Sequence, residues 1–474
     1  MNKFLLTTLS AAVILSGCAS VWRTPMPEVK MEFKAQTNAT QVSKEWWKEF
    51  KDENLNELIE RAFKSNSNLA IALNNLDIAR INLNIAKADY LPNFNLQGSG
   101  ARAKTSAQSA TGLRSGGSAI GNAFSLSAVL SYEVDLWGRV RNSVAAKKET
   151  FAGSVYDYEG AKVSIAAGVA EAYFNLVMLG EQEEILKKTL TTYESTYAYR
   201  QNQRRAGAIN EVVALQAKAS VDSAKVQLLD VQTAKSSAAS ALAVLVGASL
   251  DEILNADVKV AKRIAKSPEV PSGLSADILQ KRADVASALQ TLKASNALTG
   301  VARANWLPRL SLTGLFGFES MELGNLFKSN AVAWSGAASA AMPLLDWGKT
   351  YNGVELAELS QNAAFLNYQQ VVKNAFSEVH TALVTRKNAL AKERAMEDYF
   401  ASVERIYNLT KSRYNAGAAT HLDFLDAQRQ FLSVHLSLAS TKLAVATSAI
   451  GVFKAFGGGF ESEATQNATN SSVK

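Results

Sequence analysis

The feature that most constrains this 474-residue chain is an internal duplication. Three phrases occur twice and in the same order: a Leu-Pro phrase, a Trp-Gly pair and an Ala-Gly-Ala triplet. The copies are Tyr90–Gly98 and Trp306–Gly314, Trp137–Gly138 and Trp347–Gly348, and Ala206–Ala208 and Ala416–Ala418. The second and third pairs have the same offset in the sequence, and the offset of the first pair is slightly larger. We therefore predict two similar units, each far longer than the roughly 20–50 residues of a solenoid repeat.

Each unit contains a stretch that favours one long helix. No proline occurs between Trp137 and Gly207, nor between Trp347 and Gly417. Both stretches are rich in Ala, Glu, Lys, Leu and Gln, which favour helix. A helix of that length would reach about 105 Å and would need a neighbour along its whole length.

The sequence after Gly417 indicates such a neighbour. Apolar residues recur there in steps of three and four, the 3.5-residue spacing of a coiled coil, with one charged interruption. The positions are Leu422, Leu425, Arg429, Leu432, Leu436, Ala439, Leu443 and Ala446. Each Ala-Gly-Ala triplet is therefore predicted to be the turn of a long antiparallel helical hairpin. Val212, Leu215 and Ala219 begin the same spacing in the first copy.

Between the Leu-Pro and Trp-Gly phrases the periodicity changes to two. From Phe124 to Leu136 apolar and polar residues alternate with Val129 as the single exception, which predicts a strand. Phe94 and Leu96 alternate with polar residues in the preceding segment, and the second copy repeats this plan more weakly. Four strands of this length suit a bilayer, but an open sheet would leave its edges unpaired in lipid. Outer-membrane barrels have at least about eight strands, so two or more chains would have to share one barrel.

The N-terminal segment, from Met1 to Cys18, predicts an export signal. Lys3 precedes an apolar run from Phe4 to Leu15, which is too short to span a bilayer and is typical of a signal-peptide core. The run ends in Leu-Ser-Gly-Cys, which resembles the lipobox of bacterial lipoproteins and implies lipid attachment at Cys18. Ala19 then permits sorting to the outer membrane. The alternative is a stray cysteine in an ordinary signal peptide; because Cys18 is the only cysteine, no internal disulfide can form.

Composition argues against several classes of function. The net charge of +7 is spread along the chain and does not indicate nucleic-acid binding. Beyond the signal no uninterrupted apolar run of about 18 residues predicts a membrane-spanning helix. The three histidines lack metal-binding spacing, and no P-loop or GxSxG motif occurs. We expect no metal, no cofactor and no enzymatic activity.

Several phrases resemble the TolC-like outer-membrane efflux duct family, especially its lipoprotein branch of OprM- and CmeC-like ducts. In addition to the lipobox and the Trp-Gly pairs, they are Trp46–Ile59, Val270–Val285, Gly300–Gly314 and Arg413–Gln430. Together they extend from Cys18 to about residue 457. One departure is Lys281–Asp284 (KRAD), where the family usually has Arg-Arg-Pro-Asp, and this puts the helix boundary there in doubt.

The resemblance implies an α+β membrane protein that forms a homotrimer. Three chains would give a 12-stranded outer-membrane barrel, four strands per chain, above a long periplasmic coiled-coil barrel of 12 helices. An equatorial region is expected near residues 250–273. The expected division is a signal peptide at 1–17, a lipid-anchored segment at 18–52, duct repeats at 53–267 and 268–457, and a polar tail at 458–474. The strand hairpins are expected near 93–136 and 309–345, and the helical hairpins near 137–247 and 347–456.

The resemblance also places a periplasmic gate at the second hairpin turn. Leu422 would form an apolar ring and Asp426 an acidic ring, with Asp423 and His421 in the same turn. The alternative is that Leu422 continues the coiled-coil core and that Asp426 is simply solvated. Glu133 and Asp135 are expected to face the lumen, where solvation is a better explanation than catalytic pairing.

The function implied is a passive exit duct of a tripartite multidrug efflux pump for drugs and other toxic compounds. Its partners would be outer-membrane lipid, a periplasmic adaptor and an inner-membrane transporter of the RND type, with no nucleic acid. One alternative is an exit duct for type I protein secretion. Another is a structural coiled-coil lipoprotein without a channel, although such a protein would not need duplicated amphipathic strands.

Overall fold

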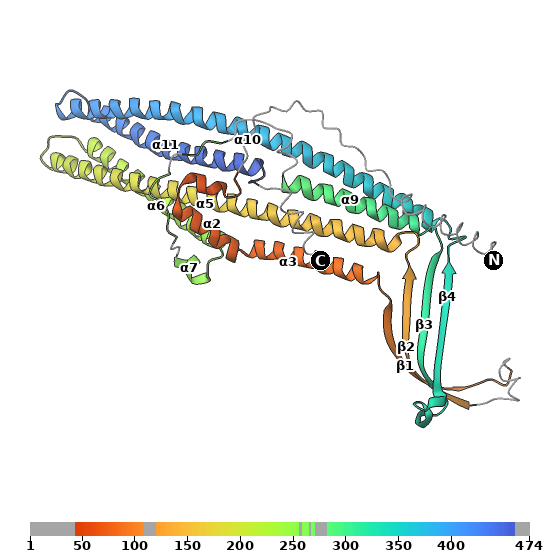
Figure 1. Ribbon diagram of the computed structural model, residues 1–474. Coiled ribbons are helices and arrows are strands. Elements are labelled where there is room, and N and C mark those ends of the chain that lie inside the picture. Colours follow the sequence, from red (N-terminus) through yellow and green to blue (C-terminus); the bar gives the residue numbers. More distant parts are fainter. Residues whose placement is uncertain (1–42, 109–119, 256–257, 265–266, 271–281, 460–474) are drawn as a thin grey trace. The chain divides into compact units, whose positions relative to one another are not determined.

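The computed structural model describes residues 43–108, 120–255, 258–264, 267–270 and 282–459 (Figure 1). The expected signal peptide, Cys18, the start of the lipid-anchored segment and residues 460–474 of the polar tail lie outside these residues. The described residues form two compact units. One contains residues 76–154 and 288–368, and the other contains residues 43–75, 155–287 and 369–459.

The first unit contains a four-stranded antiparallel sheet. Its strands are β1 (Asn93–Lys104), β2 (Ile120–Val134), β3 (Arg309–Ser320) and β4 (Val332–Ala341), and they follow one another in sequence order across the sheet. Between β3 and β4 lie two short 3-10 turns, η2 (Leu323–Asn325) and η3 (Ser329–Ala331). The predicted pair of strand hairpins is confirmed, and β1 and β4 form the two edges.

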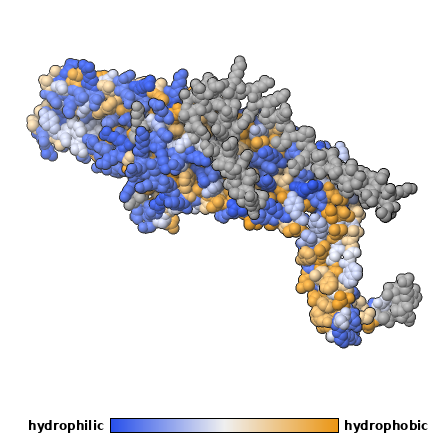
Figure 2. Space-filling view, in the orientation of Figure 1, coloured by the Kyte–Doolittle hydropathy of each residue, from blue (hydrophilic) through white to orange (hydrophobic). Residues whose placement is uncertain are grey.

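The register of the sheet collects apolar side chains on one face. Phe94 lies opposite Leu130, and Leu96 lies opposite Ala128, which in turn faces Phe316 and then Trp334. Because side chains alternate across a strand, the intervening serines, asparagines and threonines share the other face. Phe94, Leu96 and Trp334 are 70%, 76% and 77% exposed. Figure 2 shows this hydrophobic surface in orange over the strands.

Close approach of two strands explains a glycine on the polar face. A Cβ atom at Gly317 in β3 would lie 2.2 Å from the carbonyl oxygen of Leu126 and 2.5 Å from the Cα of Ser127, both in β2. No side chain fits there without moving the backbone of β2. Gly314 in the same strand is different, because its Cβ would make an ordinary contact of 3.6 Å with Leu130.

The helices of the two repeats match in length. Helices α3 (Ser67–Ala88) and α9 (Ala283–Ala304) precede the strand hairpins and have 22 residues each. Helices α5 (Arg139–Arg205) and α10 (Lys349–Asn415) follow them with 67 residues each. Helices α6 (Glu211–Leu245) and α11 (His421–Ala455) have 35 residues each. The predicted duplication and its long helical hairpins are therefore present in the structure.

The second unit is built around an aromatic core. The N-terminal turn η1 (Trp46–Phe50) inserts Trp46, which stacks on Phe453 of α11 with ring centroids 5.3 Å apart. Phe50 of the same turn packs on Phe174 of α5 at 4.9 Å. Helix α2 (Glu53–Ser65) follows directly, and the short helix α7 (Leu250–Asn255) lies in the stretch after α6. The start of the described chain is thus part of the helical core.

Two helices also contain windows that would suit a membrane by composition. An 18-residue window in α5 and another in α11 have the length and hydropathy of a spanning segment, but 61% and 56% of these windows are buried within the structure. These windows are apolar on average, so the absence of an apolar run of about 18 residues in the sequence does not predict them. Their burial against other helices accounts for their apolar character.

The helix boundary at the KRAD phrase lies where the family's proline would place it. Helix α9 begins at Ala283, which is the first helical position, where proline is also favoured. Arg282 precedes it and is buried, with Nη2 2.8 Å from Asp284 and 2.7 Å from Glu378. Its Nη1 also donates to the carbonyl oxygen of Ala455. These contacts hold the boundary without the proline.

Candidate functional site

The turn that carries the predicted gate is a tight helix ending. Gly417 has a φ of +74°, a left-handed conformation that favours glycine. Its N–H donates to the carbonyl of Tyr414 at 3.0 Å, and the N–H of Ala418 donates to that of Arg413 at 2.8 Å, which is a Schellman motif. Gly207 ends α5 in the same way with a φ of +72°. The predicted Ala-Gly-Ala turns are confirmed.

Asp423 acts as part of the N-terminal cap of α11. The backbone N–H of Thr420 donates to the Asp423 carboxylate at 2.9 Å, and the hydroxyl of Thr420 accepts from the backbone N–H of Asp423 at 3.1 Å. This reciprocal pair is a capping box. The Thr420 hydroxyl and backbone N–H lower the pKa of Asp423. Its geometry therefore fixes the start of the helix.

His421 lies in a half-buried cluster that the sequence does not predict. Its Nδ1 is 3.3 Å from a terminal nitrogen of Arg200 on α5 and 3.4 Å from the hydroxyl of Tyr414 on α10. The guanidinium of Arg200 also lies over the Tyr414 ring at 5.0 Å, and that ring stacks on Phe424 at 4.8 Å. Burial and the charge of Arg200 lower the pKa of His421 to about 4. This cluster joins the ends of the two helical hairpins.

Leu422 and Asp426 point away from this packing. Leu422 is 52% exposed, whereas Phe424 and Leu425 are buried. Asp426 has an ion pair 3.7 Å long with Arg429, and both side chains are more than half exposed. Leu422 therefore does not continue the buried row within one chain, whereas the rest of the row, from Leu425 onward, is largely buried. The two residues lie one turn apart on α11, so they share one side of the helix.

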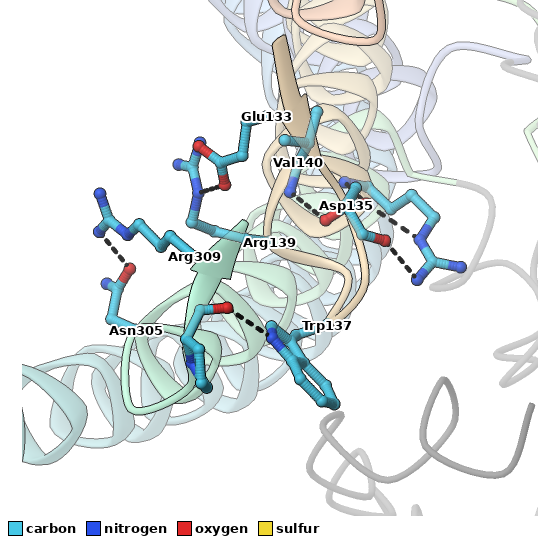
Figure 3. Close-up of polar contacts among 9 residues, drawn as sticks. Glu133, Asp135, Trp137, Arg139, Val140, Asn305 and Arg309 are labelled. Carbon is cyan, nitrogen blue, oxygen red and sulfur yellow. Dashed lines mark hydrogen bonds and ion pairs between the residues drawn. The ribbon is translucent and has the colours of Figure 1, made fainter. Parts of the chain in front are cut away.

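Glu133 and Asp135 have structural partners at the junction between strand and helix (Figure 3). Glu133 forms two hydrogen bonds with Arg139, of 2.6 and 2.8 Å. Asp135 accepts from the backbone N–H groups of Val140 and Arg141 at the start of α5, and also from the Arg141 side chain. The expectation that solvation explains both carboxylates is wrong, because Asp135 caps the helix and Glu133 is paired.

The repeated Leu-Pro and Trp-Gly phrases meet each other in the structure. The indole nitrogen of Trp137, from the first Trp-Gly pair, donates to the carbonyl oxygen of Pro308, from the second Leu-Pro phrase, at 2.8 Å (Figure 3). Its counterpart Trp347 is 88% exposed. One copy of this contact is therefore made within the chain, and the other tryptophan remains at the surface.

Comparison with known proteins decides the family. A sequence model described as outer membrane efflux protein matches residues 58–248 and 274–458, which together are most of the chain. The chain belongs to the outer membrane efflux protein family. The two matched segments correspond to the two copies of the duplication.

Similar proteins agree over nearly the full length. The chain is 30% identical to the probable efflux pump outer membrane protein TtgC of Pseudomonas putida, with 100% of this chain and 99% of that protein covered. It is 28% identical to the cation efflux system protein CusC of Escherichia coli K12, over 97% of this chain and 100% of that protein. The crystal structure of the Campylobacter jejuni CmeC outer membrane channel matches with a TM-score of 0.89 and 35% identity, covering 95% and 97% of the two chains.

These similarities confirm the expected family, fold class and location. The chain is an outer-membrane channel protein of efflux systems, with a strand hairpin and a long helical hairpin in each repeat. Its family consists of efflux proteins rather than enzymes. Within the described residues no cluster of three or more His, Cys, Asp or Glu side chains could hold a metal ion.

Proposed function

We propose that the chain is one subunit of a homotrimeric exit duct in a tripartite multidrug efflux pump. The observation that carries the proposal is that the chain makes only one of the two equivalent contacts between its Trp-Gly and Leu-Pro phrases. Trp137 reaches Pro308 within the chain, and by the same geometry Trp347 would reach Pro92 of a neighbouring copy. The edge strands β1 and β4 support the same conclusion, because β1 of one copy can pair with β4 of another.

The helices support the same arrangement. In α11 the row that includes Leu432 and Ala439 is buried against Leu186 and Leu179 of α5. The corresponding row on α6 contains Val212, Leu215, Val226 and Leu229, which are between 53% and 59% exposed. By the duplication, α10 of a second copy would cover it, as α5 covers α11. Head-to-tail contacts of this kind close into a ring when the rotation from one copy to the next completes a full turn.

Three copies would give the 12 strands and 12 long helices expected of the family resemblance. An open sheet in lipid would leave the backbone N–H and C=O groups of its two edge strands without hydrogen-bond partners, and a closed barrel removes these edges. The apolar face of the sheet would then face lipid, and the face carrying Gly317 would face the lumen. Cys18 would carry the lipid anchor, and the repeats would span about 53–267 and 268–457.

The gate proposal rests on the exposure of Leu422 and Asp426. In a ring of three, both side chains could converge on the axis, because neither is used in packing within its own chain. Three ionised carboxylates close together repel one another, so such a closed state is easily opened by a partner. Asp423 contributes by fixing the start of α11 through its capping box.

Ethidium accumulation in cells tests the efflux function. We expect deletion of the gene to raise ethidium accumulation and the wild-type gene to restore export, with a periplasmic adaptor and an inner-membrane transporter of the RND type supplying energy and opening. Unchanged accumulation, together with a loss of secreted proteins, would instead favour an exit duct for type I secretion. A chain that forms no ring and no pore would favour the structural lipoprotein.

Conductance in planar bilayers tests the gate. Asp426→Ala should raise the closed-state conductance of the purified channel because it removes the acidic ring. Asp398→Ala is the matched control, since Asp398 is an exposed acid on α10 away from the turn. Equal conductance of the wild type and the Asp426→Ala variant would count against the gate.

A further inference from the structure

A cavity lies where the second strand hairpin meets α10, within the strand-bearing unit. Its volume is about 590 Å³, which is within the roughly 300–1,000 Å³ of small-molecule sites. Two exposed cations line it, Arg309 at the start of β3 and Lys349 at the start of α10, and Leu307 and Met342 give it apolar walls. The cavity therefore combines positive charge with apolar surface.

Neither cation is neutralised within the chain. Arg309 donates from Nη2 to the side-chain oxygen of Asn305 at 2.8 Å, and this acceptor is an uncharged amide (Figure 3). Among the described residues no carboxylate forms an ion pair with Arg309 or Lys349. Asp346 also lines the cavity, but both of its carboxylate oxygens accept from backbone N–H groups at the turn that begins α10. Its role is to cap that helix.

The first repeat neutralises the equivalent cation. Arg139 stands there in the position of Lys349, and Glu133 binds it through two hydrogen bonds of 2.6 and 2.8 Å (Figure 3). These hydrogen bonds raise the pKa of Arg139 although burial opposes them, and the charge of Asp89 adds to the rise. A cation at this junction is thus held by acids when its role is structural.

The second repeat lacks both acids and has one more cation. The equivalence of the positions is supported by the sheet, because Asn93 lies opposite Ser131 just as Arg309 lies opposite Ala341. Each of three differences between the repeats makes the second junction more positive. The equivalent pairs are Glu133 and Pro343, Asp89 and Asn305, and Asn93 and Arg309.

The register of the sheet places Arg309 on the polar face. Leu310 and Leu312 belong to the apolar face, and successive side chains of a strand alternate between faces. Arg309 therefore shares a face with Gly317, which borders the lumen in the proposed barrel. The cavity then opens toward the path of the exported compounds.

These features suit an organic anion. Guanidinium and ammonium groups both bind carboxylate, sulfonate and phosphate oxygens, and the apolar walls favour a ligand with an apolar body. We propose that Arg309 and Lys349 bind amphipathic organic anions on the lumenal side of this junction. Three copies would form a ring of such cations, which raises the local concentration of anions. The lumenal position rests on the proposed trimeric duct, while the binding chemistry does not.

A carboxylate of the next copy is not expected to occupy the cavity. By the duplication, α3 and β1 of the next copy would approach α10 as α9 and β3 approach α5 within the chain. There Asn305 accepts from Arg309 and not from Arg139. Its counterpart Asp89 in the next copy should likewise leave Lys349 unpaired.

Heating the full-length protein in detergent tests the binding. The probes are 2-naphthalenesulfonate and the uncharged 2-naphthalenesulfonamide, which has a similar shape. The sulfonate should raise the unfolding temperature saturably by about 2 °C, and the sulfonamide should not. Lys349→Gln should reduce this rise by at least half. Lys328→Gln removes an exposed lysine at the other end of the strands and should keep the full rise.

The first repeat suggests a second variant. Pro343→Glu places a carboxylate where Glu133 lies in the other repeat, so it should pair with Lys349 and abolish the rise. Pro343→Gln changes the same residue without adding charge, and it should bind the sulfonate better than Pro343→Glu does. Equal binding by these two variants would contradict the assigned role of Lys349.

Several outcomes would overturn the proposal. The same rise with both probes, none with either, or an undiminished rise in Lys349→Gln would each do so. A rise that appears only after Asp89→Asn would show that a carboxylate of the next copy fills the cavity. A rise with phosphatidylglycerol but not with the sulfonate would mean that the cations bind a lipid headgroup instead of a compound in the lumen.

Ion selectivity in planar bilayers tests the lumenal position. The reversal potential is measured across a potassium chloride gradient near 0.1 M, where charges act over about 10 Å. Lys349→Gln should shift the selectivity toward cations, and Lys328→Gln should not. Equal selectivity of the wild type and Lys349→Gln would overturn the lumenal assignment. If no pore forms at all, the proposed function fails, but the thermal test still decides whether the cavity binds organic anions.

Discussion

The indole of Trp347 is the most informative single group in the strand-bearing unit. It is 88% exposed although its counterpart Trp137 is hydrogen-bonded. Trp347→Phe keeps most of the apolar ring and removes the N–H donor. We expect it to lower the temperature at which the oligomer dissociates in detergent gels, by several degrees if the missing bond contributes about 1 kcal/mol. Trp334→Phe should have no such effect, because Trp334 lies on the apolar face of β4.

The environment of His421 predicts a dependence of stability on pH. Its folded pKa of about 4 lies below the usual value of 6.5. Between these two values the unfolded histidine binds a proton and the folded one does not, so stability is full above about pH 6.5 and falls as the pH drops toward 4. Arg200 faces the same ring and adds to this effect, and Tyr414 contributes no charge.

Hydrogen exchange can measure this effect at the end of the hairpin. Protection factors for the first turns of α11 should fall between pH 6.5 and 4 in the wild type. They should change less in His421→Asn, which cannot take up a proton. Equal pH profiles for the two proteins would contradict the prediction. Asp423 should contribute only below about pH 5, where its carboxylate begins to take up a proton in the unfolded chain, since its folded pKa is lowered from 3.8.

At the scale of elements, close packing of β2 and β3 gives a sharp test of the sheet. Gly317→Ala would place a methyl group 2.2 Å from the backbone of β2, so the two strands must separate. We expect loss of the heat-resistant oligomer and poor insertion into outer membranes. Gly314→Ala on the same strand adds a methyl group at an ordinary contact distance and should be tolerated. Similar behaviour of the two variants would show that the close approach is unimportant.

The elements also show what a sequence can and cannot predict. The 67-residue helices and the Ala-Gly-Ala turns could be predicted because proline-free composition and glycine placement are local signals. The Thr420–Asp423 capping box is present in the sequence as a Thr-x-x-Asp pattern, although the family resemblance assigns Asp423 to the gate. Arg200 gave no signal, because the groups that it contacts on α10 and α11 belong to the other repeat of the chain. The exposed apolar row on α6 has coiled-coil spacing, yet spacing alone does not identify the helix that covers it.

For the whole molecule, the duplication predicts the register between neighbouring copies. Within the chain Ala439 of α11 packs with Leu179 of α5. By the offset between the two repeats, Leu229 on α6 is equivalent to Ala439, and Ala389 on α10 is equivalent to Leu179. Leu229 of one copy should therefore pack against Ala389 of the next copy. A chain carrying both Leu229→Cys and Ala389→Cys should therefore form disulfide-linked oligomers on oxidation.

The control for this experiment comes from the geometry of α10. Lys387 lies two residues before Ala389, on nearly the opposite side of the helix, so Leu229→Cys with Lys387→Cys should not cross-link. The native Cys18 would be blocked by its lipid, and a Cys18-only chain should stay uncross-linked. Cross-linked species no larger than a trimer would fit a closed ring. A continuous ladder beyond three copies would instead mean open head-to-tail association, and the closed duct would have to be abandoned.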